Sequence, residues 1–315
     1  TEGDDATLTV SQDTSVPSAQ GFGKSLKIAV TTANASVAAD EEQKIAQRIE
    51  GQFLQQLLYG TSSAKSFTLS FWVKSNITGT YAMEFQNDDN DKVQTATYTI
   101  SSADTWEKKT ITISGDTASG FDNDANRSFR VLWWLAAGSN YTSNNASSGA
   151  WIARSSNIDS IAYGHAVNVT SSTSNTFYLT GCQLEVGTSA SDFEFLPYDV
   201  NLQRCQRYLF TVTSPSGQGR FASGGFFTGT GADVIVSFPV EMRSSYSMSY
   251  SSLSDFRITS HTASSALASL VLDTSNCLTA ANVRPTGSTT PGVAGNYCLL
   301  YTSSSSAKLF FDAEL

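Results

Sequence analysis

The stretch FTLSFWVK, residues 67–74, decides the fold class because apolar and polar side chains alternate along its whole length. One set is entirely apolar and consists of Phe67, Leu69, Phe71 and Val73. Successive side chains of a β-strand point to opposite faces, so a period of two predicts a strand. The apolar face is expected to lie in a core, and the other face carries Trp72 and Lys74.

Similar short segments recur on both sides of this strand, separated by turn-forming Gly, Asn, Asp and Pro. We predict strands at residues 8–10, 26–30, 43–49, 81–85, 95–100, 109–113, 129–135 and 177–186, with one or two helical turns at 52–58. Many short strands at such intervals are typical of a β-sandwich or jelly roll.

The pattern changes near Pro197, where Asp199 can cap a short helix that ends near residue 207. With 315 residues, the chain is long enough for two domains with separate cores. We predict an all-β protein of two antiparallel β-sandwich (jelly-roll) domains, residues 1–198 and 208–315, joined by a short helix at 199–207. Expected strands of the second domain are 234–240, 246–250, 267–272, 297–301 and 308–315, with long loops at 214–231, 251–265 and 286–295.

Charge and hydropathy exclude two classes of partner. The net charge of -9 would repel phosphate backbones, and no cluster of Lys and Arg offsets it, so no nucleic-acid partner is expected. No apolar stretch approaches the ~20 residues needed to span a bilayer, so no membrane insertion is expected.

The four cysteines lack a CxxC pair and a nearby His, which argues against a zinc site. Two alternatives remain at this stage. Cys277 and Cys298 could form a disulfide across neighbouring strands, or all four could be small buried residues.

Three longer segments carry a resemblance. They are QRIEGQFLQQLLYGTSSAKSFTLSFWVKSNITGTY (residues 47–81), WLAAGSNYTS (134–143) and FYLTGCQLEVGTSASDFEFLPYDVNLQRCQRYLF (177–210). They resemble a module of tail-fibre and structural proteins of marine tailed phages, which looks like the jelly roll of carbohydrate-binding modules. The closing DAEL, residues 312–315, is similar to the ends of such fibres. The resemblance implies a virion protein on the phage tail or fibre, assembled as a homotrimer with other tail proteins.

Three functions are compatible with this resemblance. The first is a phage fibre or spike subunit that attaches to a host surface glycan or receptor, with specificity in residues 213–307. The second is a carbohydrate-binding module pair of a secreted glycan-degrading enzyme. The third is a structural virion decoration protein without a ligand.

Sugar binding by a sandwich uses aromatic rings on an exposed sheet face. Trp72 and Trp134 are both out of phase with the core-facing residues of their strands. If these strands share one sheet, Trp72, Lys74, Arg130 and Trp134 line one face and form a ligand-binding site. The alternative is that a loop, a helix or another subunit covers this face.

Acidic runs offer the oxygen ligands that calcium prefers, at Asp88, Asp89, Asp91, Asp122 and Asp124. A structural calcium is one interpretation, and solvated Asp-rich turns are the other. No other cofactor is expected.

Catalysis is not expected. The carboxylates Glu84, Asp88, Glu107 and Glu185 are not paired by sequence for glycoside hydrolysis. The two histidines, His165 and His261, are not near a strained Gly-x-Ser-x-Gly turn, and both are expected in loops or at the surface.

Overall fold

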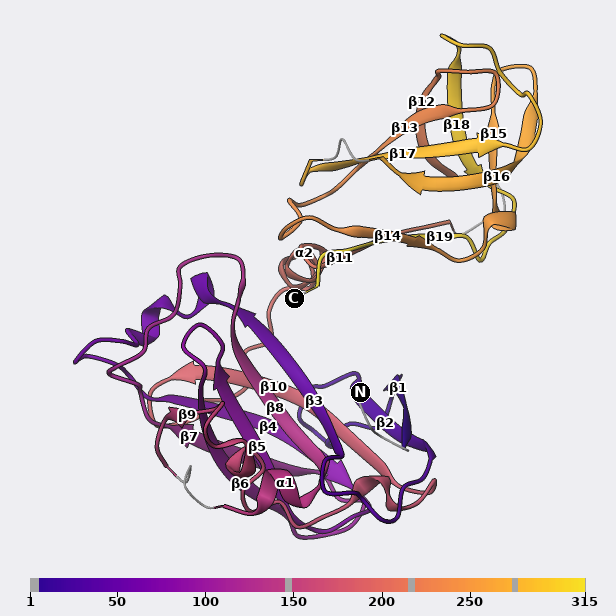
Figure 1. The fold of residues 1–315 in the computed structure, drawn as a ribbon. Helices are drawn as coiled ribbons and strands as arrows, with labels where there is room; N and C mark the ends of the chain where they lie inside the picture. Colours follow the sequence, from indigo (N-terminus) through magenta and orange to yellow (C-terminus); the bar gives the residue numbers. More distant parts are fainter. Residues whose placement is uncertain (1–5, 145–148, 215–218, 274–276, 315) are drawn as a thin grey trace. The chain divides into compact units, whose positions relative to one another are not determined.

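The structure, a computed structural model, describes residues 6–144, 149–214, 219–273 and 277–314. It divides into two compact units, Thr1–Glu194 and Phe195–Glu314. The regular structure is almost entirely antiparallel strand (Figure 1), which confirms the predicted all-β class. The division falls close to the boundary predicted at residue 198.

The first unit contains two five-stranded antiparallel sheets. The first sheet has the order β1-β2-β10-β4-β7, and the second has the order β3-β8-β5-β6-β9. Their strands are β1 (Thr7–Asp13), β2 (Ser25–Thr32), β3 (Glu42–Glu50), β4 (Phe67–Ser75), β5 (Gly79–Asn87), β6 (Lys92–Ile100), β7 (Glu107–Ile113), β8 (Arg127–Ala137), β9 (Ile152–Ala153) and β10 (Thr176–Val186).

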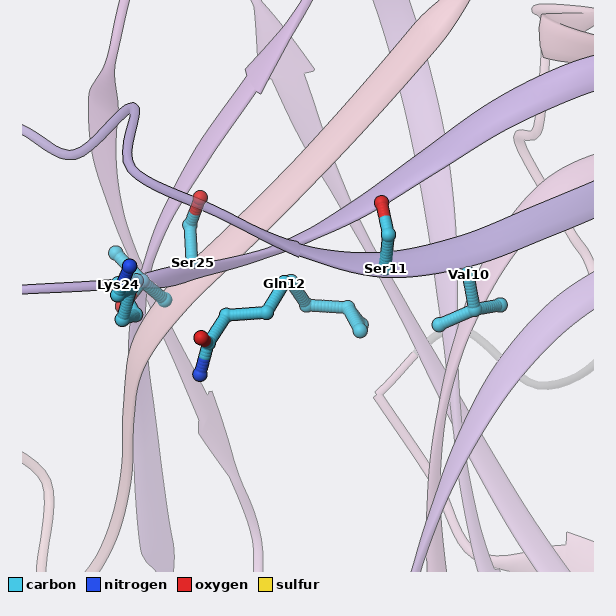
Figure 2. A pocket seen from close by; sticks show the side chains of 7 residues that line it. Val10, Ser11, Gln12, Lys24 and Ser25 are labelled. Carbon is cyan, nitrogen blue, oxygen red and sulfur yellow. The ribbon is translucent and has the colours of Figure 1, made fainter. Parts of the chain in front are cut away.

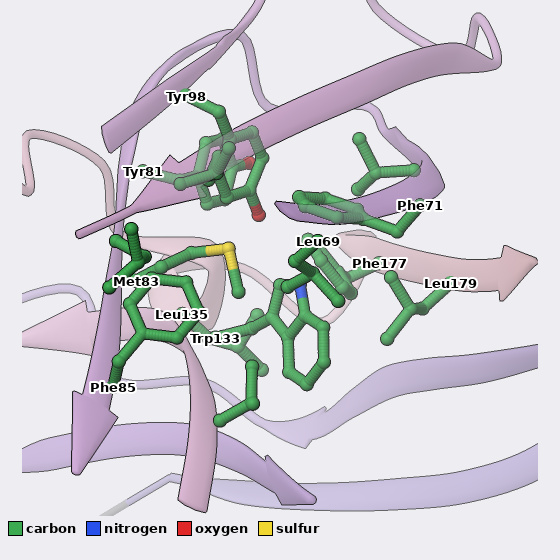
Figure 3. Close-up of a cluster of buried hydrophobic side chains, with 14 of the residues drawn as sticks. Leu69, Phe71, Tyr81, Met83, Phe85, Tyr98, Trp133, Leu135, Phe177 and Leu179 are labelled. Carbon is green, nitrogen blue, oxygen red and sulfur yellow. The ribbon is translucent and has the colours of Figure 1, made fainter. Parts of the chain in front are cut away.

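The core of this unit is rich in aromatic rings from both sheets (Figure 3). Phe71 of β4 meets the ring of Trp133 of β8 edge to face at 5.8 Å. Tyr98 of β6 also contacts Phe71, at 5.2 Å, and stacks on Tyr81 of β5. The alternation of residues 67–74 therefore has the predicted cause, since Phe67, Phe71 and Val73 are 0% exposed.

Short helical segments connect these strands. They are η1 (Gly51–Phe53), η2 (Gln55–Leu57), α1 (Ser139–Thr142), η3 (Ile158–Ser160) and η4 (Val169–Ser171). The first two are the helical turns predicted at 52–58. A side chain at Gly51 would place its Cβ 2.0 Å from the Asp122 carbonyl oxygen, so a glycine is required where these turns begin.

The second unit begins with a helix and contains two sheets. Its elements are α2 (Tyr198–Gln206), β11 (Leu209–Thr213), β12 (Arg220–Phe226), β13 (Ala232–Ser237), β14 (Ser247–Tyr250), η5 (Leu253–Asp255), β15 (Phe256–Thr259), β16 (Ser264–Leu272), β17 (Ala280–Gly287), β18 (Tyr297–Thr302) and β19 (Lys308–Asp312). Six of the strands close into a barrel in the order β12-β13-β17-β16-β15-β18, and β11-β19-β14 form a separate sheet. The sequence did not predict this closure.

Two of the three long loops predicted in this unit contain regular structure. Strand β12 occupies much of 214–231, and η5 and β15 occupy much of 251–265. A side chain at Gly224 would place its Cβ 1.8 Å from the Asp233 carbonyl oxygen, so this glycine lets two strands of the barrel approach. Residues 215–218 of the first predicted loop lie outside the described residues.

The described thiols also correct the sequence prediction. All four cysteines are free, so the alternative disulfide between Cys277 and Cys298 is absent. Cys182, Cys205 and Cys277 are exposed, and Cys298 is buried. The expectation of four buried cysteines is therefore wrong for three of them.

No helix within the described ranges is long and apolar enough to cross a membrane.

Candidate functional site

The first sheet carries a row of alternating basic and aromatic side chains on the face opposite its core. Tyr178 of β10 is in register with Lys27 of β2 on one side and with Lys74 of β4 on the other. The ammonium nitrogen of Lys74 lies 4.1 Å from the centre of the Tyr178 ring, and that of Lys27 lies 5.6 Å from it. Both distances are within the range of cation–π attraction.

A second row lies next to the first. Trp72 of β4 is in register with Lys108 of β7 and with Thr180 of β10. Trp106, which precedes β7, extends the surface, because its ring is 6.1 Å from that of Tyr178 and 5.5 Å from the Lys74 ammonium. We call the set Lys27, Trp72, Lys74, Trp106, Lys108 and Tyr178 the aromatic–basic face.

This face is partly open. Trp72, Lys74 and Trp106 are half-buried, and Lys108 is exposed. Tyr178 is 9% exposed because the two lysine side chains lie over its ring. Lysine stems are flexible, so a ligand that displaces them would reach the ring beneath.

Two neighbouring segments border the face. The loop before β2 contributes Ser15, whose hydroxyl is 2.7 Å from the Lys74 ammonium. The segment after β10 contributes Ser191, whose carbonyl oxygen is 3.5 Å from the Lys108 ammonium. The two segments meet where Phe22 packs edge to face on Phe193 at 5.0 Å.

Asp13 is the acidic neighbour of this surface. Its carboxylate is 3.5 Å from the Lys27 ammonium. A hydrogen bond from the backbone N–H of Ser15, with Lys27 and Lys74 nearby, lowers the pKa of Asp13. Interaction with the Tyr178 side chain, together with Asp13, raises the pKa of Lys27. Both groups are therefore charged at neutral pH.

A hollow of about 510 Å³ lies along β1 and β2 (Figure 2). It is lined by Val10, Ser11, Gln12, Lys24, Ser25, Leu26 and Thr180. It shares Thr180 with the second row, and the Thr180 hydroxyl donates to the Lys24 carbonyl oxygen at 2.9 Å. Lys24 is the one charged side chain among these seven residues, so the hollow adds a further ammonium group beside the aromatic–basic face.

The structure does not bring the four predicted ligand residues together. Trp72 and Lys74 lie on β4 of the first sheet, whereas Arg130 and Trp134 lie on β8 of the second sheet. The condition that the two strands share a sheet is not met, so the predicted common face is wrong. Alternation assigned each tryptophan to the outer face of its own sheet, but it cannot assign the strand to a sheet.

Trp134 is covered rather than exposed. It is 0% exposed and packs against Tyr141 at 5.6 Å, in a small cluster with Ile161 and Ala162. The Lys44 ammonium lies 4.5 Å from the indole ring. The face around Trp134 is therefore covered by other parts of the chain, as in the alternative to sugar binding. The covering residues come from α1 and the segment around η3.

Beneath the same cover lies a buried ion pair. Glu84 of β5 is 0% exposed, and its Oε1 lies 3.3 Å from Nε of Arg154. Burial raises the pKa of Glu84, against the opposing effects of Lys44, Arg154 and Arg130. The second carboxylate oxygen has no hydrogen-bond partner among the described residues.

The acidic runs have structural partners. Asp88 accepts hydrogen bonds from Arg127 at 2.7 Å and from Arg130 at 2.6 Å, which accounts for the predicted ligand residue Arg130. Three of the other acidic side chains accept backbone N–H groups: Asp89 from Asp122, Asp91 from Ser155, and Asp124 from Asn126. Within the described ranges, no group of three or more His, Cys, Asp or Glu could hold a metal. The geometry therefore gives no support for the calcium interpretation.

The carboxylates considered for catalysis each have their own partner. Glu84 pairs with Arg154, Asp88 with Arg127 and Arg130, Glu107 with Lys109, and Glu185 with Ser191. His261 is exposed, as expected. His165 lies in a loop, as expected, but it is half-buried and its Nδ1 accepts the backbone N–H of Ala82 at 3.2 Å.

The sequence contains a signal for part of the aromatic–basic face. Tyr178 lies between the core residues Phe177 and Leu179, so alternation already placed it on the outer face. Lys27 has the same relation to Leu26 and Ile28. Trp106 lies outside the strand, and its place beside Tyr178 depends on tertiary packing that alternation does not report.

Comparisons with known proteins do not assign a family. No family model matches the chain, and no curated protein matches it. Among solved structures, the tailspike protein 4 domain of Bacteriophage CBA120 is 11% identical with a TM-score of 0.30, and the match covers 57% of this chain but 18% of that one. A family 11 carbohydrate-binding module from Clostridium thermocellum, solved with a mixed-linked tetrasaccharide, is 10% identical with a TM-score of 0.30, covering 60% and 88%. The tandem CBM22 domains of Xyn10C from Paenibacillus barcinonensis are 10% identical with a TM-score of 0.27, covering 98% and 90%. These similarities are too low to indicate what this chain does.

Proposed function

We propose that the chain is a glycan-binding attachment subunit of a phage fibre or spike, and that it catalyses no reaction. The observation that carries the binding proposal is the aromatic–basic face, where Trp72, Trp106 and Tyr178 share one side of a rigid sheet with three lysines. Aromatic rings stack on the apolar sides of sugar rings, and ammonium groups donate hydrogen bonds to sugar oxygens. The virion location rests on the sequence resemblance of residues 47–81 and 177–210.

Glycan binding is tested on a printed array of bacterial surface polysaccharides. We expect the full chain to bind at least one of them, Trp72→Ala to weaken that binding at least tenfold, and Trp72→Phe to retain most of it. Folding of each variant is checked by thermal unfolding. Unchanged binding by a folded Trp72→Ala protein, or no bound glycan at all, would overturn the proposal.

The virion location has a separate test. Mass spectrometry of purified particles from a phage that encodes this chain should detect it as a structural protein. Its absence from the particles, together with secretion beside a glycan-degrading domain, would favour the enzyme-associated alternative. Particles that contain the chain without any glycan binding would favour the decoration alternative.

The proposed assembly is a homotrimer. Its support is α2, in which none of the nine described residues is buried, although Tyr198, Leu202 and Cys205 form one stripe at helical spacing. Tyr198 is 80% exposed and Leu202 is 39% exposed. A helix this short is marginal without a partner, so contact with α2 of other copies would stabilise it.

The apolar closing strand β19 gives no support for the trimer. Leu309 and Phe311 of β19 are 0% exposed within the core of their own unit, and Phe310 is half-buried. Light scattering of the full chain should give three times the chain mass. Leu202→Asp should shift the mass toward the monomer, whereas Gln203→Asp, on another side of the helix, should not. A purely monomeric wild type would contradict the trimer.

The second unit offers an alternative receptor surface. Phe227 and Tyr297 are 50% and 54% exposed, and the Arg284 guanidinium lies 5.6 Å from the Phe227 ring centre. Arg284 also pairs with Asp233 and Asp273. If Phe227→Ala and Tyr297→Ala abolish cell binding while Trp72→Ala does not, the attachment surface lies in this unit.

A further inference from the structure

We infer that the aromatic–basic face selects anionic saccharides, those that bear a carboxylate, sulfate or phosphate group. The inference rests on the proposed glycan-binding function and adds the chemical class of the ligand. Its starting point is the charge of the face compared with that of the chain. The chain carries a net charge of -9, whereas this face brings Lys27, Lys74 and Lys108 together.

The register of the strands fixes the pattern. The first row runs Lys27, Tyr178, Lys74 across β2, β10 and β4, and the second runs Thr180, Trp72, Lys108 across β10, β4 and β7. Neighbouring strands are about 4.8 Å apart, and residues two apart on one strand are about 6.8 Å apart. The Trp72 and Tyr178 rings therefore each have a lysine on the adjacent strand, at about the spacing of neighbouring strands.

The positive charge of the face is only partly offset by neighbouring acids. Asp13 pairs with Lys27 at 3.5 Å. The hydrogen bonds of the other two lysines go to neutral oxygens, the Ser15 hydroxyl for Lys74 and the Ser191 carbonyl for Lys108. Asp13 and Glu185 interact electrostatically with Lys74 and Lys108, respectively. An anionic group placed beside Trp72 would thus meet two ammonium groups that donate no hydrogen bond to a carboxylate in the described contacts.

The arrangement joins two recognition elements. A ring of Trp72 or Tyr178 can stack on the pyranose, and Lys74 or Lys108 can pair with its acidic substituent. A neutral sugar would use the ring but leave the ammonium groups with neutral contacts. Charge-assisted hydrogen bonds are roughly twice as strong as neutral ones, so the acidic sugar should bind more tightly.

The test compares polysaccharides that differ in charge. The full chain is titrated with polygalacturonate as the carboxylate probe, dextran sulfate as the sulfate probe, a phosphorylated mannan as the phosphate probe, and neutral dextran as the uncharged control. We expect at least one anionic probe to bind at least tenfold more tightly than dextran. Its affinity should fall as NaCl rises from 50 to 300 mM, because salt screens exposed charges.

Matched variants locate the effect. Lys74→Gln and Lys108→Gln should each weaken the anionic probe at least threefold. Lys65→Gln makes the same change in chain charge at an exposed residue before β4, so it should leave binding unchanged. Equal effects of all three variants would mean a nonspecific charge effect and would overturn the inference.

The outcomes separate this inference from the proposed function. Binding of neutral glycans that requires Trp72 and ignores Lys74 and Lys108 would overturn the anionic preference and leave glycan binding intact. Preference among the three anionic probes identifies the acidic group. Failure of every probe and every array glycan would overturn both.

Discussion

Acid should destabilise the first unit through His165, and this effect can be isolated. Burial lowers the pKa of His165 from 6.5 to about 4. The neutral ring accepts the backbone N–H of Ala82 through Nδ1. In the unfolded chain the imidazole has its ordinary pKa and binds a proton from about pH 6.5 downward. The stabilisation is therefore complete above pH 6.5, decreases as the pH falls, and is lost near pH 4.

The magnitude follows from the shift. A shift of one pKa unit corresponds to about 1.4 kcal/mol. The full shift of His165, from 6.5 to about 4, therefore corresponds to about 3 kcal/mol of folding stability. At pH 5 the unfolded imidazole is almost fully protonated and the folded one is not, which gives a loss of about 2 kcal/mol relative to pH 7.5. For a unit of this size that is a fall of about 4–8 °C in Tm.

The assay uses tryptophan fluorescence, because all five tryptophans lie between residues 72 and 151 and so report only the first unit. Urea unfolding of wild type and His165→Asn is measured from pH 7.5 to pH 4.5. Asn cannot titrate, and its side-chain oxygen can still accept the Ala82 N–H. The variant should lose about 2 kcal/mol less than wild type between pH 7.5 and pH 5. Parallel pH profiles of the two proteins would refute the reasoning.

Two further predictions concern the covered face of the second sheet. Trp134→Ala should lower the free energy of unfolding by about 3–5 kcal/mol, because the indole is fully buried, whereas Trp72→Ala should cost less than half as much; equal losses in urea unfolding would contradict this. Glu84→Gln should gain stability relative to wild type as pH rises from 4 to 8, because burial raises the pKa of Glu84 and its ionised form weakens the folded state above the unfolded pKa. A variant whose relative stability falls with rising pH would contradict that sign.

Several strand positions in the first unit could be predicted because apolar residues fill every second position, on the face that points into the core. The apolar set of β4 reports its own burial, so the period of two is visible in sequence. The same logic failed for β12, where Ser223, Gly224 and Gly225 resemble a loop. In β12, Gly224 is needed because strand β13 approaches closely. A local sequence pattern does not reveal that contact. Strand β17 was not predicted for a different reason: it contains Pro285, and proline usually indicates a turn.

The candidate site shows where alternation stops being informative. Alternation assigned both Trp72 and Trp134 to outer faces, and both assignments agree with their strands, since their neighbours Phe71 and Trp133 lie in the core. The function of an outer face depends on what covers it. Trp134 is covered by Tyr141 of α1 and by Ile161 and Ala162, which follow η3. Ile161 and Ala162 lie more than 20 residues from Trp134 in sequence, so no local pattern reports this contact.

The aromatic–basic face, by contrast, depends on register. Tyr178 meets Lys27 and Lys74 because β10 lies between β2 and β4, although these strands are far apart in sequence. An irregularity in β10 between Thr180 and Gln183 then shifts the pairing with β4 by one residue beyond Trp72. A slip of one residue in β10 would turn Tyr178 into the core and Leu179 outward. The buried aromatic contacts of Phe177 oppose that slip, so the packing of the core is what holds the rings and ammonium groups of the face in place.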